Sequence, residues 1–73
     1  MTPAEITEAF TYHAPDGQQA AAYEDLRANA KAMAEGMVEM CPESRELSLA
    51  LTKLREAVMW ANAAIALHGL RRR

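Results

Sequence analysis

Pro42 separates two stretches of the chain that carry the same kind of apolar repeat. In the first stretch, apolar residues recur at alternating steps of three and four: Tyr23, Leu26, Ala30, Met33, Met37 and Met40. In the second, the same steps run through Leu47, Leu51, Leu54, Val58, Ala61 and Ile65. Such a repeat lines one side of a helix, and proline cannot continue a helix interior. The sequence therefore predicts two long helices, at about 18–40 and 43–68, packed as an antiparallel hairpin. Pro42 suits the first turn of the second helix, and Ser44 is an alternative cap for it.

A shorter helix is predicted before the hairpin, at about residues 3–9. Thr2 can cap this helix, and Pro3 suits its first turn. Residues 10–17 then form a connector, because Pro15 favours extended geometry before it and Asp16-Gly17 is typical of turns. Gly69 ends the last helix, and a basic tail occupies 69–73. We thus expect residues 1–73 to form one all-α helical hairpin domain.

The second long helix carries another apolar stripe, about 100° round the helix from the first. Its members are Ala50, Lys53, Ala57, Trp60, Ala64 and Leu67. One hairpin partner cannot cover both stripes, so another chain has to cover the second one. Asn62 is the one polar residue between Ala57 and Leu67, and a buried asparagine between helices typically fixes their register.

The small size of the chain also indicates assembly with partner chains. A domain of 73 residues buries too little surface to be comfortably stable alone. Cys41 is the only cysteine, which excludes an intrachain disulfide, and His13 and His68 are too far apart in sequence to suggest a metal cage. We therefore expect a compact homo-oligomeric bundle with no metal and no cofactor.

Composition also narrows the class of function. The net charge of −2 argues against a protein that binds DNA or RNA polymers. No apolar run is long enough to cross a bilayer, and the single cysteine and polar N-terminus favour a cytoplasmic protein. Ser44 and Ser48 have no histidine nearby in sequence, so we expect no catalytic residues and no enzyme.

Two groups of residues indicate a site for a small ligand. Phe10 and Tyr12, half of the Phe, Tyr and Trp residues in the chain, fall next to His13 in the expected connector. Aromatic rings with hydrogen-bonding tips suit a nucleobase; alternatively, Phe10 and Tyr12 close the end of the hairpin.

The second group is basic. Arg27 and Lys31 lie one helical turn apart, where like charges repel slightly unless they share an anion. The alternative is a solvated face, with Glu24 and Glu35 as intrahelical partners.

The stretches "FTYHAP", "YEDLR" and "CPESRELSLALTKLREAVMWANAAIA" resemble the bacteriophage anti-CBASS cyclic-oligonucleotide sponges, whose helical hairpin domain is shared with anti-Thoeris sponges. The resemblance runs from about Phe10 to Ala66. It implies a homohexamer in the cytoplasm of the infected bacterial host. It also implies that the hexamer binds cyclic dinucleotides such as cyclic GMP-AMP, and cyclic trinucleotides at a second site, without cleaving them. CBASS effectors then stay inactive.

The resemblance implies roles for individual residues as well. Tyr12 is expected to stack on a base, and Arg27 to meet a phosphate, with Lys31 as the alternative one turn away. His13 belongs to the same motif, and Asn29, His68 and the terminal arginines are candidates for a trinucleotide site. From the residues alone, a structural helical oligomer or protein–protein adaptor without a nucleotide ligand stays open, because a long apolar stripe fits it equally well.

Overall fold

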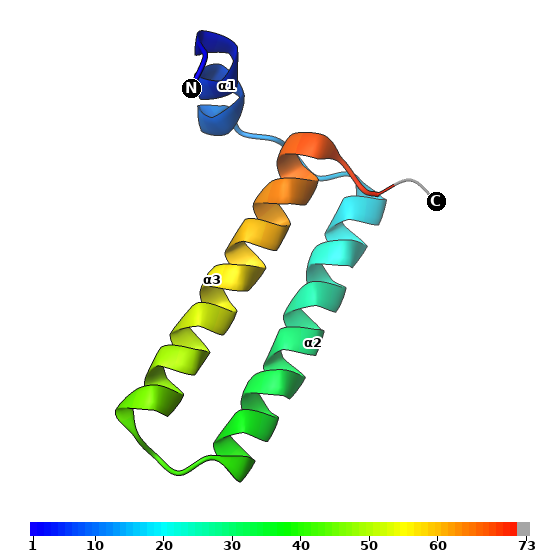
Figure 1. Cartoon of the computed structure of the whole chain (residues 1–73). Helices are drawn as coiled ribbons and strands as arrows, with labels where there is room; N and C mark the ends of the chain where they lie inside the picture. Colours follow the sequence, from blue (N-terminus) through cyan, green and yellow to red (C-terminus); the bar gives the residue numbers. More distant parts are fainter. Residues whose placement is uncertain (72–73) are drawn as a thin grey trace.

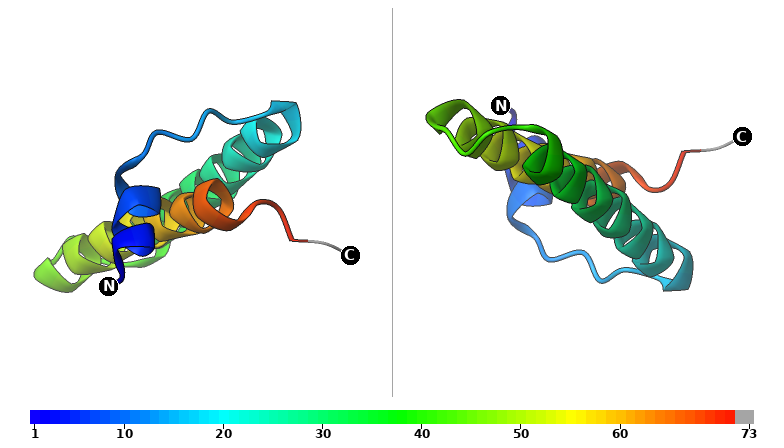
Figure 2. Two further views of the ribbon diagram at one scale, coloured as in Figure 1. Left: turned by 90° about the horizontal axis from the view of Figure 1, so that it is seen from above. Right: turned by 90° about the horizontal axis from the view of Figure 1, so that it is seen from below.

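The computed structural model describes residues 1–71 and contains three helices and no strand among them (Figure 1). These helices are α1 (Pro3–Phe10), α2 (Gly17–Met40) and α3 (Arg45–His68). α2 and α3 run antiparallel side by side, and α1 lies above the C-terminal end of α3, joined to α2 by an extended connector (Figures 1 and 2). The expected basic tail is described only as far as Arg71, because Arg72 and Arg73 lie outside the described residues. The all-α prediction is confirmed for the described chain.

Side-chain caps set the starts of all three helices. Thr2 accepts a hydrogen bond from the Glu5 amide at 3.1 Å, as the sequence indicated. At α2, Asp16 and Gln19 form a reciprocal capping box, with Gln19 N–H donating to Asp16 Oδ1 at 2.8 Å and Asp16 N–H to Gln19 Oε1 at 3.3 Å. This box satisfies two amides that a helix start leaves without partners.

The start of α3 follows the Ser44 alternative and lies two residues after the expected residue 43. Ser44 is the cap, accepting a bond from the Leu47 amide at 3.1 Å, and its own hydroxyl donates to the Pro42 carbonyl at 3.0 Å. The helix therefore begins at Arg45, not at residue 43, and Pro42 stays in the loop. At the other end Gly69 stops α3 as predicted: it has φ 79° and ψ 178°, which only glycine adopts easily, and its N–H donates to the Ile65 carbonyl at 2.8 Å.

The facing sides of α2 and α3 form the hairpin seam. All six predicted seam residues of α3 are half-buried, as are Tyr23, Leu26, Ala30 and Met37 of α2. Met33 and Met40 are exposed instead, and Ala34 is half-buried, so the prediction was wrong at these two methionines. A straight helix drifts by about 20° per heptad relative to a strict seven-residue repeat, and this drift turns Met33 and Met40, one and two heptads after Leu26, away from the seam.

The hairpin has no core of its own. Within residues 1–71, no side chain is buried, and the radius of gyration is 15.3 Å, whereas a compact chain of this length has about 11 Å. The hairpin exposes 6335 Å² of surface, against about 4,500 Å² for a folded monomer of the same mass. Over its described residues, the single chain is therefore extended and has no buried core.

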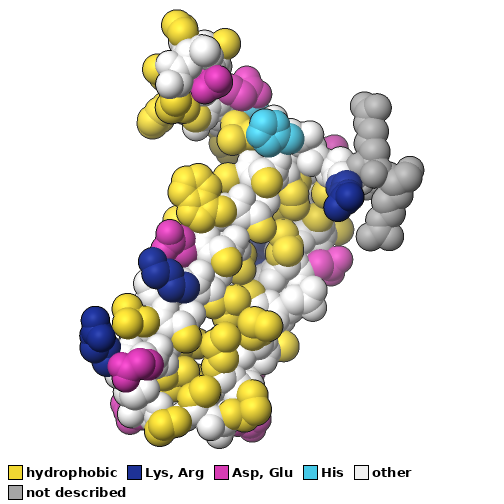
Figure 3. All heavy atoms as spheres, viewed as in Figure 1, with side chains coloured by type: hydrophobic (Ala, Val, Ile, Leu, Met, Phe, Trp, Pro, Cys, Tyr) yellow, Lys and Arg dark blue, Asp and Glu magenta, His cyan; other side chains and the backbone are white. Residues whose placement is uncertain are grey.

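The second stripe of α3 is largely uncovered. Trp60 is 70% exposed, and Ala57 and Ala64 are also exposed. Lys53, within this stripe, lies 3.5 Å from the Glu56 carboxylate. Hydrophobic side chains accordingly spread over both long helices on the face seen in Figure 3. None of the described helices combines the length and hydrophobicity needed to cross a bilayer.

The capping box at α2 makes a testable contribution to stability. Asp16→Ala removes the acceptor for the Gln19 amide, so we expect the free energy of unfolding to fall by about 1 kcal/mol in urea titrations at fixed protein concentration. Asp25→Ala is the matched control, because Asp25 lies exposed inside α2, where alanine is a better helix former. Equal losses from both variants would contradict a capping role for Asp16.

Candidate functional site

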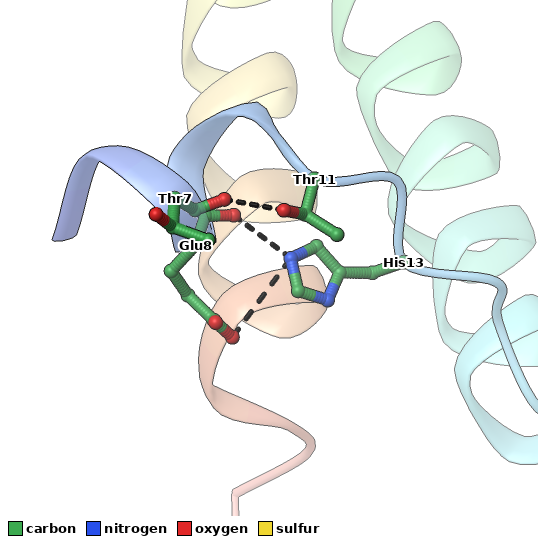
Figure 4. Close-up of polar contacts among 4 residues, drawn as sticks. All are labelled: Thr7, Glu8, Thr11 and His13. Atoms are coloured by element: carbon green, nitrogen blue, oxygen red, sulfur yellow. Dashed lines mark hydrogen bonds and ion pairs between the residues drawn. The ribbon is translucent and has the colours of Figure 1, made fainter. Parts of the chain in front are cut away.

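The connector after α1 is fixed to the last turn of that helix. His13 Nε2 donates to the Glu8 carbonyl at 2.9 Å and lies 3.8 Å from Glu8 Oε1. Thr11 donates to the Thr7 carbonyl next to it, and the His13 ring points back toward α1 (Figure 4). These bonds satisfy carbonyl groups that the end of a helix leaves without partners. Nε2 of His13, a candidate ligand residue, is therefore occupied within the single chain.

The two rings beside His13 are open to solvent. Tyr12 is 83% exposed and Phe10 is 85% exposed, whereas His13 is half-buried. Phe10 is the last residue of α1, whereas the sequence placed it in the connector. The alternative in which Phe10 and Tyr12 close the end of the hairpin is wrong for the single chain. Instead, the ring of Tyr12 is exposed to solvent, next to the His13 residue that is bonded to α1.

Arg27 borders a cavity between α2 and α3 near the open end of the hairpin. The cavity has a volume of about 490 Å³, and its lining residues are Tyr23, Arg27, Met59, Asn62, Ala63 and Ala66. Asn62 Oδ1 is buried and has no hydrogen-bond partner. The cavity thus joins a cation and an unsatisfied acceptor inside a mostly apolar lining.

The other basic candidate and Asn29 lie elsewhere on α2. Lys31 is exposed one turn from Arg27, and Asn29 is exposed about 200° round the helix from Arg27. Neither residue lines the Arg27 cavity. Among the described residues, oppositely charged side chains meet within 4 Å at His13 with Glu8 and at Lys53 with Glu56. The alternative in which Glu24 pairs with Arg27, and Glu35 with Lys31, is therefore not formed.

His68 lies beside acidic residues. It lines a cavity of about 410 Å³ between α1 and the end of α3, together with Met1, Glu5, Glu8, Ala9 and Leu67. The two carboxylates that line this cavity with His68 disfavour an anion there within one chain. Among residues 1–71, no three side chains of the His, Cys, Asp and Glu types gather closely enough to hold a metal ion.

The structure therefore brings the candidates together in two separate groups. Phe10, Tyr12 and His13 gather at the connector, and Arg27 meets Tyr23 and Asn62 at the hairpin cavity, which does not include Tyr12. Sequence reasoning missed that Asn62 lines the same cavity as Arg27, and it missed the role of Glu8 in holding His13. The first depends on how α2 and α3 dock. The second joins residues five apart in sequence, but a bond from a side chain to a backbone carbonyl leaves no repeat pattern that could indicate it.

The anchor of the connector can be tested by hydrogen exchange. His13→Ala removes the bond to the Glu8 carbonyl, so we expect backbone amides of residues 11–14 to exchange about fivefold faster, as the net loss of about 1 kcal/mol implies. Glu8→Gln is the matched control, because it keeps the carbonyl and changes only the carboxylate 3.8 Å away. Unchanged exchange in His13→Ala would show that the connector is held by other contacts.

Comparison with known proteins identifies the family of this hairpin. The family model described as Acb2/Tad1, hairpin domain, matches residues 2–66. Neither the curated proteins nor the solved structures give a match to the chain. Since the family match spans nearly all of the described chain, the protein belongs to the Acb2/Tad1 hairpin-domain family, the anti-CBASS and anti-Thoeris sponges, which are known for sequestering cyclic oligonucleotides.

Proposed function

We propose that this protein binds cyclic oligonucleotide second messengers and holds them without cleavage, so that CBASS effectors stay inactive. Its membership of the sponge family over residues 2–66 carries the proposal. Cyclic dinucleotides such as cyclic GMP-AMP are the first ligands we propose, and cyclic trinucleotides are the second class. The site of action is the cytoplasm of the infected bacterial host.

The candidate residues offer the chemistry that such a ligand requires. A cyclic dinucleotide presents two bases and two phosphates. The exposed ring of Tyr12 can stack on a base, a contact that contributes about 1–3 kcal/mol. The Arg27 guanidinium can bind a phosphate with two parallel bonds, while Lys31 one turn away supplies a second positive charge.

A homohexamer completes this proposal. The single chain has no buried side chain and leaves Trp60 70% exposed, so neighbouring copies supply the missing cover. Tyr12 does not line the cavity of Arg27 within one chain. Assembly can bring Tyr12 of one copy to Arg27 of the next, and the family resemblance favours six copies.

Assembly through the exposed stripe of α3 predicts a charge-sensitive interface. Trp60→Glu places a charge in this stripe, so we expect the mass from light scattering to fall and the melting temperature to drop. Arg55→Glu is the control, because Arg55 lies on the opposite side of α3, and we expect its mass to be unchanged. The wild-type melting temperature should rise with protein concentration. A wild-type monomer at micromolar concentration would contradict the hexamer.

A capture-and-release assay tests the function itself. The protein is mixed with cyclic GMP-AMP and retained on a filter, and the filtrate is analysed. The retained protein is then denatured, and the ligand that it releases is analysed in the same way. We expect the messenger to leave the filtrate and to return intact. A linear product on release would indicate an enzyme. If the protein captures neither cyclic dinucleotides nor cyclic trinucleotides, the result would favour the alternative of a protein–protein adaptor.

The same assay tests the stacking role of Tyr12. Tyr12→Ala should weaken the affinity for cyclic GMP-AMP by ten- to a hundredfold, which corresponds to the stacking energy of about 1–3 kcal/mol. Tyr12→Phe keeps the ring and should bind within about threefold of the wild type. Wild-type affinity in Tyr12→Ala with the oligomer intact would remove Tyr12 from the site.

A further inference from the structure

Asn62 has a buried acceptor that the chain does not use. Its Oδ1 has less than 1 Å² of accessible surface and no hydrogen-bond partner. Leaving a buried carbonyl oxygen unsatisfied is costly, and most such atoms in folded proteins have a partner. The register-fixing role expected from the sequence stays a prediction, and within the hairpin it supplies no hydrogen-bond partner for this oxygen.

Few groups around the cavity can supply the missing donor. The side chains of Met59, Ala63 and Ala66 have no donor, and their backbone N–H groups lie inside α3, where helical bonds use them. The remaining lining residues with a side-chain donor are Arg27 and Tyr23. The guanidinium offers five N–H groups in a rigid fork, whereas the tyrosine offers one hydroxyl.

We propose that Asn62 is a positioning residue, whose Oδ1 accepts a bond from the Arg27 guanidinium and holds its remaining donors toward a ligand phosphate. This inference rests on the proposed function. The terminal torsion of asparagine is soft, so the amide can turn Oδ1 toward the cavity when Arg27 closes over it. A neutral amide orients the guanidinium without cancelling its charge, which a carboxylate in the same place would do.

The positioning role predicts opposite effects on stability and on binding. Asn62→Leu removes the unsatisfied oxygen and keeps a similar volume, so the melting temperature of the ligand-free protein should stay the same or rise. The affinity for cyclic GMP-AMP should fall about tenfold, because Arg27 loses its orientation. Thr52→Val is the matched control: it is a polar-to-apolar change on α3 outside this cavity, and both values should stay at wild-type levels.

A double-mutant cycle identifies the donor. If Asn62 acts through Arg27, Asn62→Leu should cost about tenfold in the wild type and less than twofold in Arg27→Ala. Tyr23→Phe should leave the Asn62→Leu effect unchanged. A full loss in the Arg27→Ala background would overturn the proposal, as would a Tyr23→Phe variant that abolishes the effect.

A spectroscopic measurement keeps the inference separate from the proposed function. In the wild-type complex with cyclic GMP-AMP, the Arg27 side-chain Nε–H should give an NMR signal protected from exchange with water. This signal should be lost in the Asn62→Leu complex formed at saturating ligand.

If no wild-type complex forms, the proposed function fails and the positioning role of Asn62 fails with it. If the complex forms but the signal is the same in both proteins, only the positioning role fails. A lower melting temperature of Asn62→Leu together with a changed oligomer mass would favour the register role of Asn62 and would overturn the positioning role.

Discussion

The packing of the α3 leucine seam against α2 is the contact on which the rest of the structure depends. It fixes the two long helices side by side, and this alignment creates the cavity shared by Arg27 and Asn62 and places the end of α3 beneath α1. The same seam leaves its residues only half-buried. Hydrophobic stabilisation grows with the apolar area removed from water, so half-buried seam residues stabilise the hairpin only in part. The main effect of this contact is to set how the two helices lie against each other.

Hydrogen bonds at the helix ends supply the precision that the seam lacks. The Asp16–Gln19 box and the Ser44 cap define where α2 and α3 begin. The His13 bond to Glu8 fixes the residue that follows Tyr12 to the end of α1. As a result, an exposed aromatic ring is carried by a short segment with both ends attached to helices. Such a segment loses less conformational entropy when it binds a ligand than a free terminus would.

The sequence was sufficient to predict the fold but only part of the candidate site. Apolar spacing and the breaks at Pro42 and Gly69 identified both long helices, because helical periodicity is a local property. Helix α3 starts at Arg45, two residues later than the expected residue 43, because the alternative cap Ser44 accepts a bond from the Leu47 amide. Met33 and Met40 were misplaced because an ideal heptad ignores helical drift. That Arg27 and Asn62 line the same cavity depends on how two helices dock, and no local pattern encodes it. Whether Tyr12 of one chain reaches Arg27 of another is a property of the assembly.

The loop between α2 and α3 has a practical consequence for studying the protein. Cys41 is exposed in this loop and is the only thiol in the chain. The loop lies at the opposite end of the hairpin from the connector (Figure 1), separated from Asp16 by the 24 residues of α2, or about 36 Å of helix. A maleimide dye or surface tether would therefore attach at one defined point on each chain, far from Tyr12. The native sequence thus already carries a labelling handle for fluorescence or immobilised-binding studies, with no added cysteine.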